Sequence, residues 1–169
     1  IITVCLNSEN TIISTLNSVL SQTFDDIEHI IVDGGSTDKT IEIINNYTHK
    51  NKKIIISKNS GIYDSMNIGI KASTGDIITI LNSDDIYQNN EIIDKTAKII
   101  KDNYDYPIYL GNVVYFKNSS FYHLYRYFKS DNFKRWHLKY GIMPPHPSSF
   151  IKKEIYNKYG LYNNTFKIA

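Results

Sequence analysis

The sequence predicts an α/β fold in which helices cover a mainly parallel β-sheet. Short apolar runs rich in Ile, Val and Leu recur along the first hundred residues, at 1–6, 27–32, 54–57 and 76–81. Each run leads through a polar loop into a segment whose apolar residues recur at helical spacing. Strands that alternate with helices in this way are typical of βαβ units, whose strands lie parallel and are buried on both faces.

The first two strand-helix units lie within residues 1–47. The β-branched run at 1–6 is too short for a helix and fits a buried strand. A helix is expected from Thr11, because the apolar residues that follow fall on one helical face (Ile12, Leu16, Val19 and Leu20). The run at 27–32 predicts the second strand. The next apolar group predicts a second helix (Ile41, Ile43, Ile44 and Tyr47), with Ser36 or Thr37 suited to cap its unpaired first amides.

Two further units complete the regular part of the chain. The run at 54–57 predicts the third strand, and residues 62–71 predict a helix with an apolar face (Ile62, Met66 and Ile70). A Ser-Thr-Gly turn then precedes the fourth strand, expected at 76–81. The helix expected at 91–101 has isoleucines on its apolar side (Ile92, Ile93, Ile99 and Ile100).

Beyond residue 101 the alternation weakens. A strand is expected at 108–116, a shorter one at 148–152 and a Lys-rich helix at 153–159. Neither a linker nor an internal repeat separates the two parts, so the simplest organisation is one domain over residues 1–169. The chain begins inside an apolar run without Met and ends without a turn signal, and we therefore expect a piece truncated at both ends.

The composition indicates a folded chain without disulfides. Of the 169 residues, 41% are apolar and 21% are charged, which excludes collagen-like, coiled-coil and largely disordered proteins. Cys5 is the single cysteine, and no apolar run reaches the length of about 18 residues that spans a bilayer. A reducing, cytoplasmic setting is therefore expected.

Charge is divided unevenly along the chain. Residues 1–100 hold 8 Lys and 13 Asp or Glu, a net charge of −5, whereas residues 101–169 hold 11 Lys or Arg and 4 Asp or Glu, a net charge of +7. Between residues 115 and 140 basic side chains alternate with aromatic ones. This mixture is suited to nucleic acid, sugars or an anionic membrane surface, and a partly buried helix with a solvated charged face explains it equally well.

Two adjacent carboxylates follow the fourth predicted strand. Asp84 and Asp85 end the sequence Leu-Asn-Ser-Asp-Asp, and neighbouring carboxylates repel each other unless a cation relieves the repulsion. Hard oxygen ligands suit Mg²⁺ or Mn²⁺, with substrate phosphates completing the coordination shell. A polar turn in which one carboxylate caps the helix at 91–101 is an equally good explanation of this motif alone.

Two other segments lie at the carboxyl edge of the predicted sheet, where parallel sheets bind ligands: the loop at 33–38 and the start of the helix at 62–71. In the loop at 33–38, glycines allow a close backbone approach and Asp33 can accept a hydrogen bond from a base or ribose, although an ordinary capped turn is the simpler explanation. Asp64 and Asn67 share a face near the start of the helix at 62–71. The chain lacks both Gly-x4-Gly-Lys-Ser/Thr and a G-x-G-x-x-G after its first strand, which argues against a P-loop and a dinucleotide fold.

The histidines and the cysteine give weaker signals. His146 lies between prolines, in a rigid loop where a packed histidine is commoner than a catalytic one. The other four histidines lack the spacing of a zinc site. Cys5 lies within the first strand and is expected to be buried and inert.

Together these motifs resemble family 2 glycosyltransferases of the GT-A fold. In chain order the matching segments are TVCLN (3–7), SVLSQTF (18–24), IIVDGGSTD (30–38), GIYDSMNIG (61–69), ASTGD (72–76) and LNSDD (81–85). The later segment HPSSF (146–150) resembles a subgroup that builds bacterial capsule and exopolysaccharide. The resemblance implies a Rossmann-like GT-A sheet over the chain.

The resemblance also implies a nucleotide-diphosphate-sugar donor, expected to be a UDP-sugar, and a divalent metal, Mn²⁺ or Mg²⁺. Asp84 and Asp85 match the acidic metal and diphosphate motif, whose first acidic position is Asn82 here. Asp33 matches the first residue of the acidic pair after the second strand, whose second position is Gly34. The residues implied at the nucleotide sugar are Asn7, Asp33, Gly34, Gly61, Asp64, Asn67, Asn82 and Asp84, with His146 as the candidate on the acceptor side.

By the same resemblance, residues 1–101 form the nucleotide-sugar part and residues 102–169 begin the acceptor part. The general base of inverting members is expected beyond Ala169. The acceptor is expected to be a saccharide or lipid-linked saccharide in bacterial cell-surface polysaccharide synthesis, with peripheral contact at the inner membrane face and no nucleic acid partner. A sugar-phosphate nucleotidyltransferase and a non-catalytic nucleotide- or carbohydrate-binding module stay open as alternatives, although a Gly-rich basic loop typical of the first is missing after the first strand.

Overall fold

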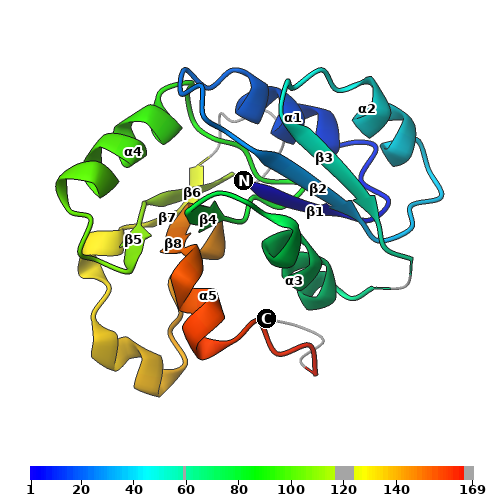
Figure 1. The fold of residues 1–169 in the computed structure, drawn as a ribbon. Helices are drawn as coiled ribbons and strands as arrows, with labels where there is room; N and C mark the ends of the chain where they lie inside the picture. The colour runs from blue at the N-terminus through cyan, green and yellow to red at the C-terminus, as the bar shows by residue number, and fades with distance from the viewer. Residues whose placement is uncertain (59, 117–123, 166–169) are drawn as a thin grey trace.

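The fold is known from a computed structural model, which describes residues 1–58, 60–116 and 124–165 (Figure 1). Its strands and α-helices are β1 (Ile2–Cys5), α1 (Ile12–Leu20), β2 (His29–Asp33), α2 (Thr40–Asn46), β3 (Lys52–Ile56), α3 (Ile62–Ala72), β4 (Ile77–Thr79), α4 (Ile92–Asp102), β5 (Ile108–Leu110), β6 (Val113–Phe116), β7 (Leu124–Phe128), β8 (Ser149–Lys152) and α5 (Lys153–Tyr159). Three short 3₁₀ helices are η1 (Ser130–Asn132), η2 (Arg135–Tyr140) and η3 (His146–Ser148). None of the described helices is long and apolar enough to cross a bilayer.

The central sheet has a parallel half and an antiparallel half. β2 pairs in parallel with β1 and β3, and a parallel bridge from Ile2 to Ile80 joins β1 to the chain just after β4. β8 pairs antiparallel with β4 on one side and with β5 on the other. The strand order is therefore β3-β2-β1-β4-β8-β5. The α/β prediction with a parallel sheet is confirmed for the first four strands. β8 alone runs against them, because β5, antiparallel to β8, has the direction of β4 again.

Helices cover both faces of the parallel half. Alternate side chains of β1 and β2 point to opposite faces, as a strand requires. One set packs on α3 and α5, in a buried cluster of Ile2, Val4, Ile30, Val32, Met66, Ile70, Ile78, Ile80 and Tyr156. The other set packs on α1 and α2, in a cluster of Cys5, Ile12, Leu16, Ile31, Ile44 and Tyr47. β1, β2 and most of β4 are buried because both faces are covered. β3 lies at the edge of the sheet and is only partly buried, with Ile56 45% exposed.

The strand order sends the connections after β1 and β4 to opposite sides at the carboxyl edge of the sheet. From β1 the chain proceeds through α1 to β2 and through α2 to β3, and it then crosses by α3 to β4 on the other side of β1 (Figure 1). The loops after β1 and β4 therefore lead away from each other. Open α/β sheets bind ligands at such a switch point.

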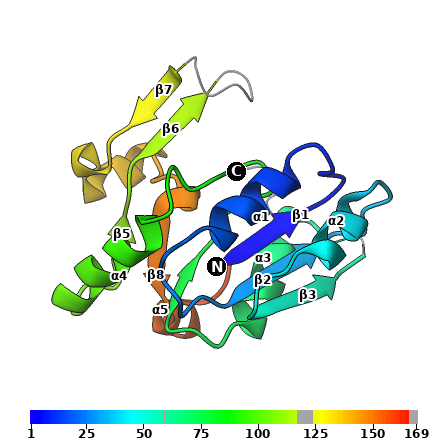
Figure 2. The ribbon, with the colours of Figure 1, turned by 90° about the horizontal axis from the view of Figure 1, so that it is seen from above.

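The second half of the chain departs from two expectations. The single strand expected at 108–116 is interrupted at Gly111, whose amide donates to the Ser148 carbonyl oxygen at 2.7 Å, so that β5 pairs with β8 while β6 pairs with β7. The partly buried helix considered for 115–140 is wrong over the described residues, which hold β7, η1 and η2. β6 and β7 form a ribbon that projects from the body (Figure 2). Residues 117–123 of the basic and aromatic segment at 115–140 lie outside the described residues.

Gly69 brings α3 into close contact with β1. A Cβ atom at this position would overlap Cγ2 of Ile2, which is buried in the sheet. We expect Gly69→Ala to lower the free energy of unfolding by about 2 kcal/mol, because overpacking outweighs a gain in helix propensity of about 1 kcal/mol. Denaturant unfolding measures this. A double variant that also carries Ile2→Ala lacks the overlapping carbons, so its loss of unfolding free energy should be smaller than the sum of the two single losses. Strictly additive losses would contradict the proposed overlap.

His29 is buried at the amino end of β2 and predicts a pH dependence of stability. Its Nε2 lies 3.0 Å from Thr3 Oγ1 and its Nδ1 lies 2.9 Å from Tyr47 Oη. Burial, assisted by His49, holds the pKa of His29 well below 6.5. The unfolded chain therefore takes up a proton near its ordinary pKa of about 6.5, whereas the folded chain does not.

The free energy of unfolding should consequently lose up to about 1.4 kcal/mol per pH unit from this group as the pH falls below about 6.5. Urea unfolding of the wild type and of His29→Gln from mildly acidic to neutral pH isolates the contribution of His29. The difference in unfolding free energy between the two proteins cancels the titration of the groups that they share. The difference between the two proteins should shrink on acidification. A difference that stays constant with pH would show that His29 titrates alike in both states.

Candidate functional site

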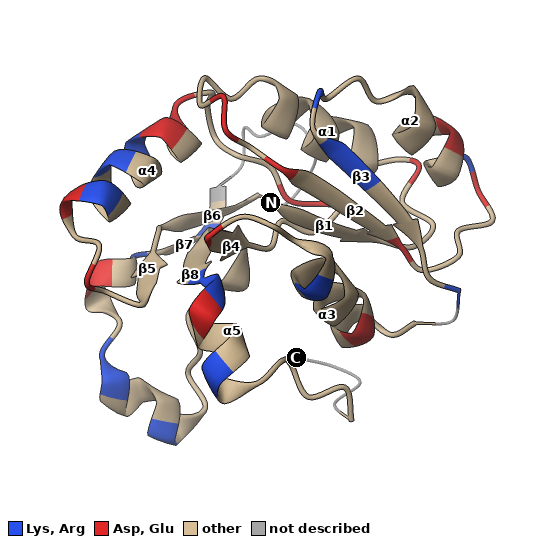
Figure 3. Cartoon of the chain, in the orientation of Figure 1, with Lys and Arg blue, Asp and Glu red and all other residues tan. Residues whose placement is uncertain are grey.

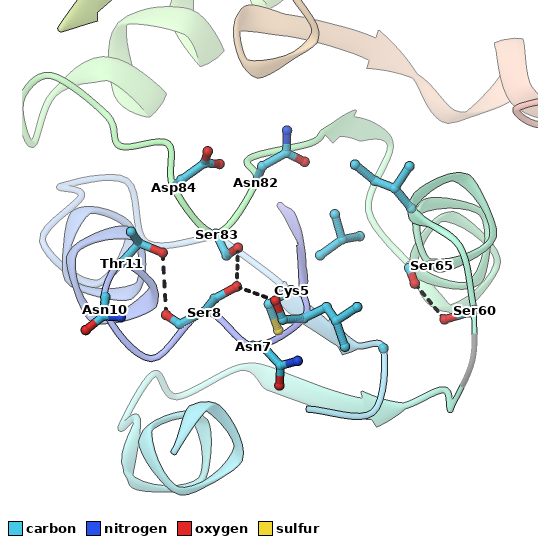
Figure 4. A pocket seen from close by; sticks show the side chains of 14 residues that line it. Cys5, Asn7, Ser8, Asn10, Thr11, Ser60, Ser65, Asn82, Ser83 and Asp84 are labelled. Atoms are coloured by element: carbon cyan, nitrogen blue, oxygen red, sulfur yellow. Dashed lines mark hydrogen bonds between the residues drawn. The ribbon is translucent and has the colours of Figure 1, made fainter. Parts of the chain in front are cut away.

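A cleft opens at the carboxyl edge of the sheet where the loops after β1 and β4 diverge (Figure 4). Its volume of about 580 Å³ lies in the range of small-molecule sites. The lining comes from the ends of β1, β2 and β4 and from the start of α3. Its residues are Val4, Cys5, Leu6, Asn7, Ser8, Asn10, Thr11, Gly34, Ser60, Ile62, Ser65, Asn82, Ser83 and Asp84.

Asn7 ties the loop after β1 to the loop after β2. Its backbone has a φ of 48°, a left-handed conformation that Asn tolerates better than most residues. Its amide donates to Ser36 Oγ at 2.8 Å, and its Oδ1 accepts from the Thr37 amide at 2.8 Å. The next amide, that of Ser8, donates to Thr40 Oγ1 at 2.7 Å. Two loops far apart in sequence thus form one wall of the cleft.

Asp33 shapes its own loop and does not line the cleft. Its side chain is fully buried, and its Oδ1 accepts from the amides of Gly35 and Ser36, both at 2.8 Å. Its Oδ2 accepts from Ser36 Oγ at 2.5 Å and from the Cys5 thiol at 3.5 Å. Gly35 takes a left-handed φ of 99° to close this turn, which leaves Gly34 as the part of the loop that faces the cleft.

Cys5 is buried as expected, at the floor of the cleft. Burial, together with the negative charge of Asp33, raises the pKa of its thiol far above the usual range. The thiol is therefore protonated at neutral pH and a poor nucleophile.

The loop after β4 carries the acidic part of the rim. Asp84 is exposed and lines the cleft, while Asp85 is partly buried beside it. Burial and then the charge of Asp84 raise the pKa of Asp85 from 3.8 to about 6. The Oδ1 atom of Asn82 is buried and has no hydrogen-bond partner among the described residues. A hydrogen bond of 2.9 Å between Ser83 Oγ and Ser8 Oγ joins this loop to the loop after β1 at one point (Figure 4), although the connections that the two loops begin lead to opposite sides of β1.

These oxygens fit a hard cation only in part. Within the described ranges no three His, Cys, Asp or Glu side chains are grouped to hold a metal ion. Asp84 and Asp85 supply two neighbouring carboxylates, and the unpaired Asn82 Oδ1 lies in the same loop. Divalent ions such as Mg²⁺ are often held in this way, with bound phosphates and waters supplying the other ligands.

The start of α3 contributes less to the cleft than the sequence suggested. Ser60 and Ser65, whose hydroxyls lie 2.8 Å apart, line it, but Gly61 at the N-cap does not. Asp64 Oδ1 accepts from Asn164 Nδ2 at 2.7 Å.

Asn67 is likewise hydrogen-bonded to the segment after α5. Its Nδ2 donates to the Tyr162 carbonyl oxygen at 2.8 Å, and its Oδ1 accepts from the Tyr162 amide at 2.9 Å. The ring of Tyr162 also stacks on Tyr63, with centroids 5.9 Å apart. Asp64 and Asn67 do share a helix face, but in this structure that face holds residues 161–165 and does not line the cleft.

His146 also lies outside the cleft lining. It begins η3, is partly buried, and has its pKa lowered by that burial. Sequence reasoning named Asn7, Gly34, Asn82 and Asp84 correctly as neighbours at one edge. It did not single out the small polar residues that complete the lining, Ser8, Asn10, Thr11, Ser60, Ser65 and Ser83, whose one signal was their position in or next to loops that follow strands.

Comparison of the chain with known proteins shows the family to which it belongs. The family described as Glycosyl transferase family 2 matches residues 1–160. The chain belongs to this family. It is 28% identical over 166 residues, 96% of its length, to a protein of Mycobacterium bovis (strain BCG / Pasteur 1173P2) named a PGL/p-HBAD biosynthesis glycosyltransferase.

Two solved structures share the fold of this family 2 chain. S. aureus TarS 1–349 in complex with UDP matches 99% of the chain with a TM-score of 0.75 and 22% identity. The mannosyltransferase PcManGT from Pyrobaculum calidifontis, in complex with GDP-Man and Mn²⁺, matches 96% with a TM-score of 0.68 and 18% identity. The chain spans 62% of the mycobacterial protein, 52% of that TarS chain and 46% of the mannosyltransferase chain.

The contact between Asn67 and Tyr162 predicts the effect of a substitution. We expect Asn67→Ala to remove both hydrogen bonds, release residues 161–165 and lower the free energy of unfolding by about 1–3 kcal/mol. Hydrogen exchange should show faster exchange at the Tyr162 amide. Asn67→Asp, which keeps the acceptor for that amide, should retain part of the protection. Unchanged exchange at residues 161–165 in Asn67→Ala would contradict this assignment.

Proposed function

We propose that this family 2 protein transfers a sugar from a nucleotide-diphosphate sugar, expected to be a UDP-sugar, to an acceptor hydroxyl with inversion at the sugar. The observation that carries the proposal is the cleft at the switch point between β1 and β4, with Asp84 on its rim. Its position is the one at which open α/β sheets bind nucleotides. The complex of TarS with UDP, in the same fold, supports a uridine nucleotide.

Mn²⁺ or Mg²⁺ is proposed to bind at Asp84 and Asp85. Among the described residues that line the cleft there is no Lys or Arg, so the lining offers a diphosphate no positive side chain. The negative rim would repel a donor unless a cation lay between them. The Mn²⁺ complex of the mannosyltransferase supports this choice of metal. When bound, such a cation stabilises the charge that develops on the leaving nucleotide diphosphate.

The chain's own residues would then orient the donor. Leu6 is 56% exposed beside Gly34 and offers an apolar surface to a base. Asn82 also lines the cleft, but its Oδ1 is buried and would accept from a donor hydroxyl only after the side chain turns. Asp33 acts indirectly, because it fixes the turn that presents Gly34.

The acceptor is proposed to be a saccharide or lipid-linked saccharide in cell-surface polysaccharide synthesis, met at the cytoplasmic face of the membrane. Residues 1–101 form the donor part, which agrees with the cleft lining. Residues 102–169, which include His146, form the beginning of the acceptor part, and their net charge of +7 contrasts with the acidic donor rim.

Calorimetric titration with UDP in Mn²⁺ tests the proposal. We expect Asp84→Asn to weaken UDP binding by at least about tenfold, the size of loss that disturbed metal sites show. Because Asp84 is exposed, the melting temperature of the Asp84→Asn protein should stay within a few degrees of that of the wild type. Chelation of the metal should abolish wild-type binding.

Asp25→Asn is the matched control, because Asp25 is an exposed carboxylate outside the cleft lining. It should bind UDP as the wild type does. Failure of UDP, GDP and UDP-sugars to bind in the presence of Mn²⁺ would refute the proposed donor site. Turnover of a nucleoside triphosphate with a sugar phosphate would instead indicate a nucleotidyltransferase.

A further inference from the structure

Residues 134–143 form an exposed surface of aromatic, aliphatic and basic side chains, the 134–143 surface. Five large apolar side chains within these ten positions are 45–74% exposed: Trp136, Leu138, Tyr140, Ile142 and Met143. Lys134, Arg135 and Lys139 are exposed as well. Figure 3 shows in blue where the Lys and Arg residues lie along the chain. Scattered exposed apolar residues are ordinary, but such a concentration indicates a surface that meets a partner.

The local structure fixes these side chains without covering them. η2 is a short 3₁₀ helix that ends at Gly141, where φ is 72°. His137 is partly buried: its Nδ1 accepts from the Lys134 amide at 3.0 Å, and its ring contacts Trp136 at a centroid distance of 4.0 Å. Tyr140 meets Trp136 edge to face at 5.8 Å. The aromatic rings therefore support one another while they stay exposed.

The 134–143 surface lies far from the parallel edge of the sheet. Figures 1 and 2 both place η2 at the end of the molecule opposite β3 and α2. The preceding strand β7 and the residue after it add Arg126 and Lys129, and Tyr125 on this strand is 74% exposed. Over residues 124–142 there are five Lys or Arg and a single acidic residue, Asp131.

We propose that the 134–143 surface docks on an anionic phospholipid bilayer. Trp and Tyr favour the membrane interface, and Leu138, Ile142 and Met143 are suited to the boundary of the acyl chains. The basic side chains complement anionic headgroups. Nucleic acids and sugars are bound by aromatic stacking and polar contacts, which would leave the exposed aliphatic side chains without a role.

Electrostatics sets the expected size of the effect. Each Lys or Arg near an anionic leaflet strengthens binding by about fivefold, so the three basic residues of the surface contribute about 100-fold. This attraction is screened by salt, whereas the apolar contribution is not. Docking requires no donor and no transfer, so the proposal stands independently of the proposed function.

Trp136 is the only tryptophan of the chain, and its fluorescence therefore reports directly on this surface. The test titrates the whole chain with vesicles of phosphatidylcholine alone or mixed with phosphatidylglycerol, and measures sedimentation with the vesicles in parallel. We expect a blue shift of the Trp136 emission and co-sedimentation with the anionic vesicles only, both reduced by high salt. Binding that is equal on the two vesicle types, or absent from both, would overturn the proposal.

Two pairs of variants separate docking from general damage. Lys134→Glu, Arg135→Glu and Lys139→Glu combined should weaken vesicle binding by at least about 100-fold, while reversal of the exposed Lys50, Lys71 and Lys101 should weaken it far less. Ile142→Ser should weaken binding, and Ile13→Ser should not, although Ile142 and Ile13 are similarly exposed at 47% and 52%.

Circular dichroism and an unchanged melting temperature establish that each variant is folded. Equal losses in variant and control would refute the assignment of the surface. A blue shift caused by an anionic polysaccharide or nucleic acid without lipid would point to that polymer instead. A shift that appears without vesicles and grows with protein concentration would point to a second copy of the chain.

Discussion

The structure depends on β1 being hydrogen-bonded on both sides. It pairs with β2 along its length, and on the other side the Leu81 amide donates to the Ile2 carbonyl oxygen at 2.9 Å. Because the chain leaves β1 toward β2 and returns to the opposite side at β4, the loops at its carboxyl end part and leave a cleft. Helices on both faces bury this strand, and the absence of a side chain at Gly69 lets α3 come close enough to do so.

Hydrogen bonds between loops give the cleft its shape, and they occupy polar side chains that the sequence suggested as ligand contacts. Asp33 is hydrogen-bonded within its own turn, and Asn67 is hydrogen-bonded to the segment after α5. What is left for a ligand is a set of amides and hydroxyls with Asp84 at the rim. Such a lining is nearly neutral apart from its acidic edge, which is why the proposed nucleotide diphosphate is expected there together with a cation.

The two proposed contacts of the molecule have opposite character, in line with the uneven charge of the chain. The donor cleft is polar and carries its charge as carboxylates, whereas the 134–143 surface combines aromatic and aliphatic side chains with Lys and Arg. The first is built by loops on a rigid sheet. The second is built by η2 and the residues beside it, none of which is buried.

The sequence alone determined the alternation of strands and helices, the burial of β1, β2 and β4, and the family, because periodicity and short motifs are local properties. It also placed Asn7, Gly34, Asn82 and Asp84 at one edge, because parallel strands end together. The tertiary structure decided the rest. Whether Asp33, Asp64 and Asn67 face a cleft, and whether β5 and β6 are one strand or two, depends on partners that are distant in sequence, such as Tyr162 and Ser148. Local pattern carries no information about which of several possible partners a polar group meets.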